Sequence, residues 1–303
     1  SRKIMSAALH PATDISNSSA IKEKGMVDTA KFAPTRRSVL KASSIGGVLA
    51  ALGSTSAANA VIRQKPADQQ RLLDPFAFNT EGWWQGLAFR QRFDAGARAG
   101  FTKVEFWDAG TSAERDPKTL AKICRDAGLK VTQFCMDMPN LPNGERREIR
   151  ERVLRTIDRA KQLDTNLLCV YHHEIVPGME KMTKQQMLYL FQARMTEIAP
   201  LLAESGMVAI IEPFNPYNHP LSCMHGSVDL LNIVRAIDSP GVKVLWDFFH
   251  LQRSEGNLID NFRRAVDQVR YVQIADSPDR GAPGTGEISY PQVLMAARQA
   301  GYT

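Results

Sequence analysis

VRYVQIADSPDRGAPGTGEISY, residues 269–290, is the stretch that decides which fold the chain is predicted to adopt. It begins with an apolar run, residues 269–275, that contains a single amide, Gln273. Proline and glycine then interrupt the run before a helical pattern begins, so the predicted order is a buried strand, a loop and a helix. Burying an unpaired amide costs about 1 to 3 kcal/mol, and a metal or ligand at the strand end would supply Gln273 with a partner.

The same alternation of apolar runs and helical patterns extends back to residue 67, in units of roughly 30 residues that are typical of βα repeats and a parallel sheet. The predicted strands are 74–79, 103–107, 130–137, 167–172, 207–213, 242–250 and 269–275. The predicted helices are 87–99, 117–127, 145–163, 184–204, 228–237, 258–266 and 290–300. The fold class is therefore α/β, a (β/α)8 TIM barrel.

The eighth strand of this barrel has no counterpart after the last predicted helix, because the sequence stops at Thr303. We expect a barrel truncated before its eighth strand, with weak or no activity. The alternative is that the N-terminal segment supplies the strand. An incomplete barrel would expose two unpaired strand edges.

The net charge of +6 is concentrated at the N-terminus, where residues 1–60 hold eight Lys/Arg and three Asp/Glu. The remainder is nearly neutral, with 30 basic and 29 acidic residues. Nucleic-acid binding needs clustered basic side chains, so the composition gives no reason to expect it. With 303 residues of which 44% are hydrophobic, the chain can bury one large core.

The N-terminal segment resembles an export signal. Residues 1–34 are polar and are expected to be disordered. PTRRSVLK at residues 34–41, a short apolar run at 42–53 and the small residues at 58–60 resemble a twin-arginine signal peptide, with Val39 where Phe is common. The apolar run is too short for a bilayer, which needs about 20 residues. We expect residues 1–60 to be a disordered N-terminus and leader, and residues 61–303 to be the barrel domain. We expect the protein to be periplasmic or otherwise exported, without a membrane segment after the leader is cleaved. A retained membrane anchor is the alternative.

Four cysteines, at positions 124, 135, 169 and 223, form no Cys-x-x-Cys pair and have no metal-type spacing. We predict that they are buried, unpaired thiols, although an exported protein would tolerate a disulfide.

Polar residues at the ends of the predicted strands are the candidates for a site, because catalytic groups of such barrels lie at the carboxyl ends of the strands. Glu212, Asp247 and Gln273 end or nearly end the last three runs, and His250 and Arg280 follow shortly after. Two carboxylates and an amide that converge on one mouth suit Mg²⁺ or Mn²⁺.

Each candidate also has a structural interpretation. Glu212 could cap a buried network, Gln273 could bond neighbouring backbone, and His250 could be a satisfied core histidine. Arg280 could simply pair with Asp276 or Asp279. Further candidates at the mouth are His172 or His173, of which at most one points inward, and Glu105.

The chain from residue 76 to residue 302 resembles the hydroxypyruvate isomerase family, within the xylose-isomerase-like barrels. The resemblance is carried by IIEPFNP at residues 210–216, WDFFHLQ at 246–252 and VQIADSPDRGAPGTGEISYP at 272–291. It implies that Glu212, Asp247 and Gln273 bind one divalent cation and that Glu212 is one of two proton-transferring carboxylates. The second, also a metal ligand, lies on the family's eighth strand and would fall beyond Thr303.

The resemblance also implies roles in substrate binding for His250 and Arg280, with His172 as a weaker candidate. The expected reaction interconverts a small hydroxy-oxo acid, as from hydroxypyruvate to tartronate semialdehyde, by proton transfer through an enediolate. Three alternatives remain open: a sugar epimerase or lyase acting on an extracellular sugar derivative, a non-catalytic binding protein, and a multi-zinc repair endonuclease, which would need more histidines. The expected partner is a small molecule, and a homo-oligomer is one open arrangement.

Overall fold

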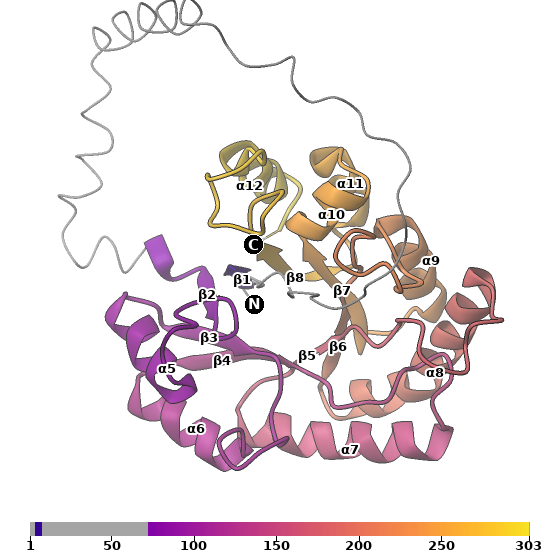
Figure 1. Cartoon of the computed structure of the whole chain (residues 1–303), viewed down its shortest axis with the longest axis horizontal. Coiled ribbons are helices and arrows are strands. Elements are labelled where there is room, and N and C mark those ends of the chain that lie inside the picture. The colour runs from indigo at the N-terminus through magenta and orange to yellow at the C-terminus, as the bar shows by residue number, and fades with distance from the viewer. Residues whose placement is uncertain (1–3, 8–71, 303) are drawn as a thin grey trace, which may run out of the picture. The chain divides into compact units, whose positions relative to one another are not determined.

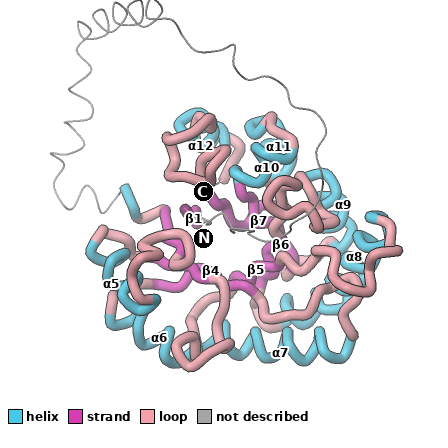
Figure 2. The backbone as a smooth tube through the Cα atoms, in the orientation of Figure 1, coloured by secondary structure: helices cyan, strands magenta, loops and turns pink. Residues whose placement is uncertain are grey.

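Eight parallel strands form a closed barrel in the order β1 to β8, and the helices surround it (Figures 1 and 2). The computed structural model describes Ile4–Ala7 and residues 72–302. The strands are β1 (Ile4–Ala7), β2 (Phe76–Asn79), β3 (Lys103–Phe106), β4 (Lys130–Cys135), β5 (Leu167–Val170), β6 (Val208–Ile211), β7 (Val242–Asp247) and β8 (Val269–Ile274). The predicted TIM-barrel class is confirmed.

Helices alternate with the strands as predicted, and most boundaries agree within two residues. They are α5 (Phe89–Arg98), α6 (Pro117–Asp126), α7 (Arg146–Gln162), α8 (Lys184–Glu204), α9 (Ser227–Ile237), α10 (Phe248–Ser254), α11 (Leu258–Ala265) and α12 (Tyr290–Gln299). Local signals explain where they begin: the Asp116 side chain accepts from Thr119 N at the start of α6, and Thr183 forms a capping box with Gln186 at the start of α8.

Strand β1 occupies the place between β8 and β2, pairing in parallel with both. Within the described residues no strand follows α12, and the position of the missing strand is filled from the N-terminal segment, which was the alternative to an open, truncated barrel. The expected unpaired edges are therefore not found, because β2 and β8 both pair with β1. The expectation of disorder for residues 1–34 is therefore wrong for Ile4–Ala7. The ladder explains the difference, because β2 and β8 each offer a row of unpaired backbone groups that a short extended segment can satisfy. The predicted leader at residues 34–60 lies outside the described residues.

Helix α10 corrects another prediction. The sixth predicted strand extends to His250, whereas β7 ends at Asp247 and a helix starts at Phe248. Asp247 is the cause: its carboxylate accepts a hydrogen bond from Phe249 N at 2.9 Å and so caps the helix. His250 consequently lies in the first turn of a helix, three residues from Asp247.

The core has two parts that follow the alternation of side chains along the strands. The larger cluster joins the helices to one face of the sheet and includes Phe78, Phe134 and Trp246. The smaller cluster takes the alternate positions of β4 to β8: Cys135, Leu167, Cys169, Ile210, Leu245 and Tyr271. These residues fill the inside of the barrel beneath its mouth.

All four cysteines are buried and free, as predicted. Cys135 and Cys169 are directly opposite each other on β4 and β5. Among the described residues, no helix combines the length and the apolar character that a membrane span requires.

Candidate functional site

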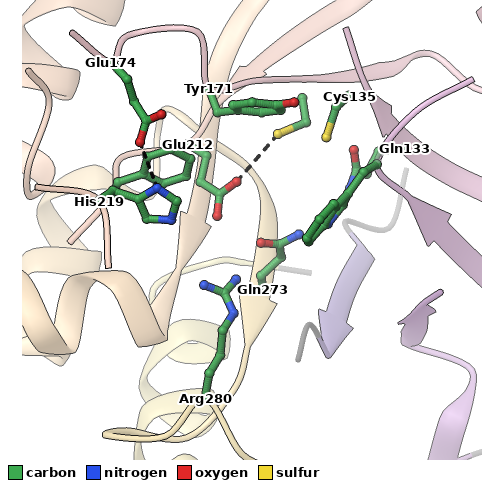
Figure 3. Close-up of a pocket in the computed structure, with 11 residues that line it drawn as sticks. Gln133, Cys135, Tyr171, Glu174, Glu212, His219, Gln273 and Arg280 are labelled. Carbon is green, nitrogen blue, oxygen red and sulfur yellow. Dashed lines mark hydrogen bonds and ion pairs between the residues drawn. The ribbon is translucent and has the colours of Figure 1, made fainter. Parts of the chain in front are cut away.

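A cavity of about 150 Å³ opens among side chains at the carboxyl ends of the strands. Pockets for drug-sized ligands usually measure about 300 to 1,000 Å³, so this cavity suits a molecule of a few carbon atoms. Figure 3 shows the side chains that line it, which are Trp107, Gln133, Cys135, Cys169, Tyr171, Glu174, Glu212, Phe214, His219, Gln273 and Arg280.

Glu212, Asp247 and His250 form a buried cluster beside this cavity, with one potential ligand atom from each lying within 4.8 Å of the others. His250 Nε2 is 3.6 Å from Glu212 Oε1 and 3.8 Å from Asp247 Oδ2. Two chain-distant segments converge here, because Glu212 directly follows β6 and Asp247 ends β7, with His250 in the helix that begins after it. The expected meeting of Glu212 and Asp247 is found, with His250 as the third member of the cluster.

The Glu212 carboxyl is unusual in its acidity. Burial, with a further contribution from the charge of Asp247, raises the pKa of Glu212 to about 8. The Arg280 guanidinium and a contact from the Cys169 thiol, 3.7 Å from Glu212 Oε2, act in the opposite direction. Two carboxylates held this close in a buried site are stabilised by a cation.

Arg280 contacts both Asp247 and His250. Its Nη2 donates to Asp247 Oδ2 at 2.6 Å, and its Nη1 lies 2.6 Å from His250 Nε2. The guanidinium also lies over the Phe249 ring, 4.8 Å from its centroid. The structural alternative for Arg280, a pair with Asp276 or Asp279, is not the arrangement found.

Both ring nitrogens of His250 face hydrogen-bond donors. Asn215 N donates to Nδ1 at 3.1 Å, and Arg280 Nη1 is next to Nε2. A guanidinium can only donate, so the 2.6 Å contact is a hydrogen bond from Arg280 Nη1 to His250 Nε2. This contact and the bond from Asn215 fix the position of the imidazole and hold the Arg280 side chain against it.

Gln273 points its amide in a defined direction. Its Nε2 donates to Glu105 Oε1 at 3.0 Å, while its Oε1 is buried without a hydrogen-bond partner. In Figure 3 this amide, the Glu212 carboxylate and the Arg280 guanidinium point toward one another. Because Gln273 pairs in register with Asp247 across β7 and β8, the three predicted ligands meet at one place.

The loop that carries Arg280 is built around Asp276. Burial opposes ionisation of this carboxyl, but backbone N–H donors including Ile288 and Gly284 outweigh it and lower the pKa of Asp276. Reciprocal backbone hydrogen bonds join Asp276 and Gly281 on either side of Arg280. Arg280 has a left-handed backbone, φ 55°, which costs a residue with a side chain about 1 to 2 kcal/mol. The loop stabilises this conformation.

Of the two histidines after β5, neither lines the cavity. His173 is fully buried and links two strand ends, with Nε2 2.8 Å from Glu212 O and Nδ1 2.9 Å from Ser222 Oγ. His172 stacks on Tyr171, at 4.5 Å between ring centroids, and lies behind it. Burial and the neighbouring His173 lower the pKa of His172 to about 4, so it is neutral at physiological pH.

Glu174 and His219 form a pair at the cavity wall that was not predicted from the sequence. His219 Nδ1 is 2.9 Å from Glu174 Oε1, and the imidazole stacks on Phe214 at 3.8 Å between centroids. This hydrogen bond lowers the pKa of Glu174. Both residues lie in loops without apolar periodicity, so only their polarity could have marked them.

The sequence model of the family described as "Xylose isomerase-like TIM barrel" matches residues 93–303. The chain is 26% identical over 223 residues to hydroxypyruvate isomerase of Escherichia coli, an alignment that covers 71% of this chain and 84% of that protein. It is 29% identical over 242 residues to 2-oxo-tetronate isomerase of Haemophilus influenzae, covering 76% and 91%. These relatives indicate that the chain is an isomerase acting on a small substrate.

Solved structures agree with the fold. A crystal structure from Brucella melitensis, titled AP endonuclease, family 2, has a TM-score of 0.68 and 25% identity and covers 75% of this chain and 89% of that one. A D-psicose 3-epimerase has a TM-score of 0.62 at 19% identity, covering 74% and 81%, which is a likeness of fold alone. From the strand-end site, the barrel and the match over most of its length, we conclude that the chain belongs to the xylose isomerase-like TIM barrel family.

Proposed function

We propose that the chain is a divalent-metal-dependent isomerase of a small hydroxy-oxo acid, of the hydroxypyruvate isomerase type. The observation that carries the proposal is the convergence of Glu212, Asp247 and the unpartnered Gln273 Oε1 beside a small cavity. The names of the relatives support the substrate class, because hydroxypyruvate and 2-oxo-tetronate are both short acids with adjacent oxo and hydroxyl groups.

The donor set fits a hard cation. Two carboxylates and one amide oxygen are ligands that Mg²⁺ and Mn²⁺ prefer, and the histidine of the cluster, His250, already accepts a backbone hydrogen bond at Nδ1. A cation held by these residues would give Gln273 Oε1 a partner and would relieve the repulsion between Glu212 and Asp247. A bound cation would hold the two substrate oxygens and offset the charge that develops on them.

The chain's own residues have separable tasks in this reaction. Glu212, whose pKa of about 8 lies close to neutral pH, takes the proton alpha to the carbonyl. Arg280 donates to the substrate, and its planar guanidinium suits the carboxylate of the acid. His250 accepts from Arg280 at Nε2 and holds the guanidinium in place beside the substrate. Apolar and aromatic walls at Trp107 and Tyr171 exclude water from the site.

Exchange of the alpha proton tests the proposal, because exchange needs one base only. With Mn²⁺ and hydroxypyruvate in deuterium oxide, the chain is expected to catalyse deuterium incorporation measurable by proton NMR. Glu212→Gln should lose this exchange, whereas Glu204→Gln, an exposed residue at the end of α8, should retain it. Exchange that persists in Glu212→Gln would refute the role of this residue and with it the proposed mechanism.

Epimerisation is the second candidate, and the same experiment separates it from isomerisation. Proton abstraction followed by return to the same carbon, from the opposite face, inverts that centre and moves no carbonyl. The chain would be tested on a panel of short sugars. Exchange of the alpha proton with inversion of the configuration at that carbon, and without interconversion of aldose and ketose, would favour the epimerase.

We also propose that the chain is exported through the twin-arginine pathway, on the basis of the PTRRSVLK sequence at residues 34–41 and the small residues at 58–60. Cleavage after residue 60 would remove β1 from the barrel and leave the edges of β2 and β8 open in the processed chain. Fractionation of cells that express the chain, compared with a variant in which Arg36 and Arg37 are both replaced by Lys, tests this. Equal periplasmic amounts of the two forms would contradict it.

A further inference from the structure

Two amide oxygens in the cavity have no hydrogen-bond partner: Gln133 Oε1 and Gln273 Oε1. The two residues are 1% and 5% exposed, and both line the cavity. A buried acceptor left unsatisfied costs about 1 to 3 kcal/mol, so each oxygen favours a ligand that brings it a donor or a cation. The proposed function uses Gln273 and leaves Gln133 without a role.

Glu105 fixes the direction of both amides. Its Oε2 accepts from Gln133 Nε2 and its Oε1 accepts from Gln273 Nε2, each at 3.0 Å. Rotating either amide by half a turn would set its oxygen against a carboxylate oxygen, and two acceptors repel. Glu105 is itself held by Asn79 Nδ2 at 2.9 Å and Tyr271 OH at 2.7 Å, so the two glutamine oxygens have no alternative but to face away from it.

The two oxygens serve different parts of the cavity. Gln273 lies on the side of Glu212 and Arg280, whereas Gln133 on β4 lies beside Cys135, on the far side from Arg280 (Figure 3). The neighbouring wall contributes thiols and the Trp107 ring rather than charges. An isolated neutral acceptor in such surroundings selects a hydroxyl donor over a carboxylate or a cation.

We propose that Gln133 determines specificity by accepting, through Oε1, a hydrogen bond from a substrate hydroxyl remote from the reacting carbons, and that Glu105 positions it. The inference rests on the proposed function and narrows its substrate class to acids with a hydroxyl beyond the reacting pair, such as four-carbon hydroxy-oxo acids. A substrate without that hydroxyl leaves the buried oxygen unpaired and is discriminated against.

Two non-reacting probes test the proposal: 2,3,4-trihydroxybutanoate and 2,3-dihydroxybutanoate, which differ by one terminal hydroxyl. Calorimetric titration in the presence of Mn²⁺ is expected to show roughly tenfold tighter binding of the trihydroxy acid, the worth of one good hydrogen bond. Gln133→Leu should bring the ratio of the two affinities close to one without weakening the dihydroxy acid. Gln162→Leu, at an exposed site on α7, should leave the ratio unchanged.

Glu105→Gln provides a second variant in case Gln133→Leu does not fold. It removes one of the two acceptor oxygens that orient the amides. The affinity for the trihydroxy acid should therefore fall more than the affinity for the dihydroxy acid, and the ratio of the two should fall. Thermal melting establishes that each variant is folded at the titration temperature.

A ratio that survives in Gln133→Leu, or a wild-type chain that binds both probes equally or neither, would overturn the proposal. Neither probe can isomerise, so the titration does not depend on turnover. Failure of the proposed function would instead appear as deuterium exchange that Glu212→Gln retains. That outcome does not bear on the ratio of the two probe affinities.

Discussion

Glu212 is the residue at which stability and chemistry oppose each other. The carboxyl of the folded chain has a pKa of about 8, whereas its ordinary value is 4.5. The folded state therefore binds this proton more tightly than the unfolded chain does. Its contribution to stability is present in full below about pH 4.5 and is lost as the pH rises through about 8.

Glu212→Gln is expected to be more stable than the wild-type chain at about pH 8 and to lose that advantage toward about pH 5, because the amide never has to ionise. Urea denaturation at several pH values, with a chelator present, measures the difference in the free energy of unfolding. Glu204→Gln provides the exposed control and should show no such trend. A difference that is constant with pH would contradict the buried, proton-binding role of Glu212.

Arg280 is expected to resist even a conservative exchange. Its two terminal nitrogens reach Asp247 and His250 separately, and the single ammonium of lysine cannot reproduce that fork. In Arg280→Lys we predict roughly tenfold or greater loss of affinity for the acid substrate, seen as a raised KM. Arg263→Lys, on the exposed face of α11, is the matched control, and an unchanged KM in Arg280→Lys would exclude the carboxylate-binding role.

The sequence was informative at these residues because a simple rule applies: polar groups that end apolar strands of a barrel meet at its mouth. Glu212, Asp247 and Gln273 obey it. Glu105 was a further candidate at the mouth, but its partners were not predictable, because its hydrogen bonds to Gln133 and Gln273 join β3, β4 and β8, which only the folded sheet brings together. Gln133 lies inside a strand among apolar residues and was not indicated. Glu174 and His219 lie in loops, and the course of a loop cannot be predicted because its sequence has no periodic pattern of apolar residues.

At the level of secondary structure, Asp247 joins a strand, a helix and the site. One oxygen caps α10 and the other accepts from Arg280. The sequence pattern continued the apolar strand through Phe248 and Phe249, since two aromatic residues favour either a strand or a buried helix. The cap decides between them, and Asp247 therefore has a structural task beside its proposed role as a metal ligand.

Two substitutions at Asp247 separate these tasks. Asn is a good helix cap without charge, so Asp247→Asn should keep α10 and lose Mn²⁺ binding. Asp247→Ala should lose Mn²⁺ binding as well and be less stable than Asp247→Asn by about 1 kcal/mol, the usual worth of a cap. Urea denaturation and calorimetric titration measure the two effects. Equal stability of the variants would show that the cap contributes nothing.

Across the whole molecule, the alternation of strands and helices was predictable, whereas closure of the sheet by the N-terminal segment was foreseen only as an alternative, without the residues that form the strand. Repeated units of similar length leave a strong signal because every strand is buried on both faces. Strand β1 leaves almost none, since four residues far from the rest of the barrel are too short for a period to be recognised. Its pairing depends on the edges of β2 and β8, which exist only once the other strands have assembled.

The four buried thiols can be used to measure how often parts of the barrel open locally. Burial raises the pKa of Cys124 to about 12 and that of Cys223 to about 11, and Cys135 and Cys169 are shifted in the same direction inside the barrel. Alkylation requires an accessible thiolate, so iodoacetamide should modify the native chain only through rare openings. Mass spectrometry of the labelled peptides would then rank four segments, α6, β4, β5 and the loop before α9, by how often each one becomes exposed. Rapid modification of Cys135 in the absence of denaturant would mean that the mouth of the barrel opens far more often than its packing implies.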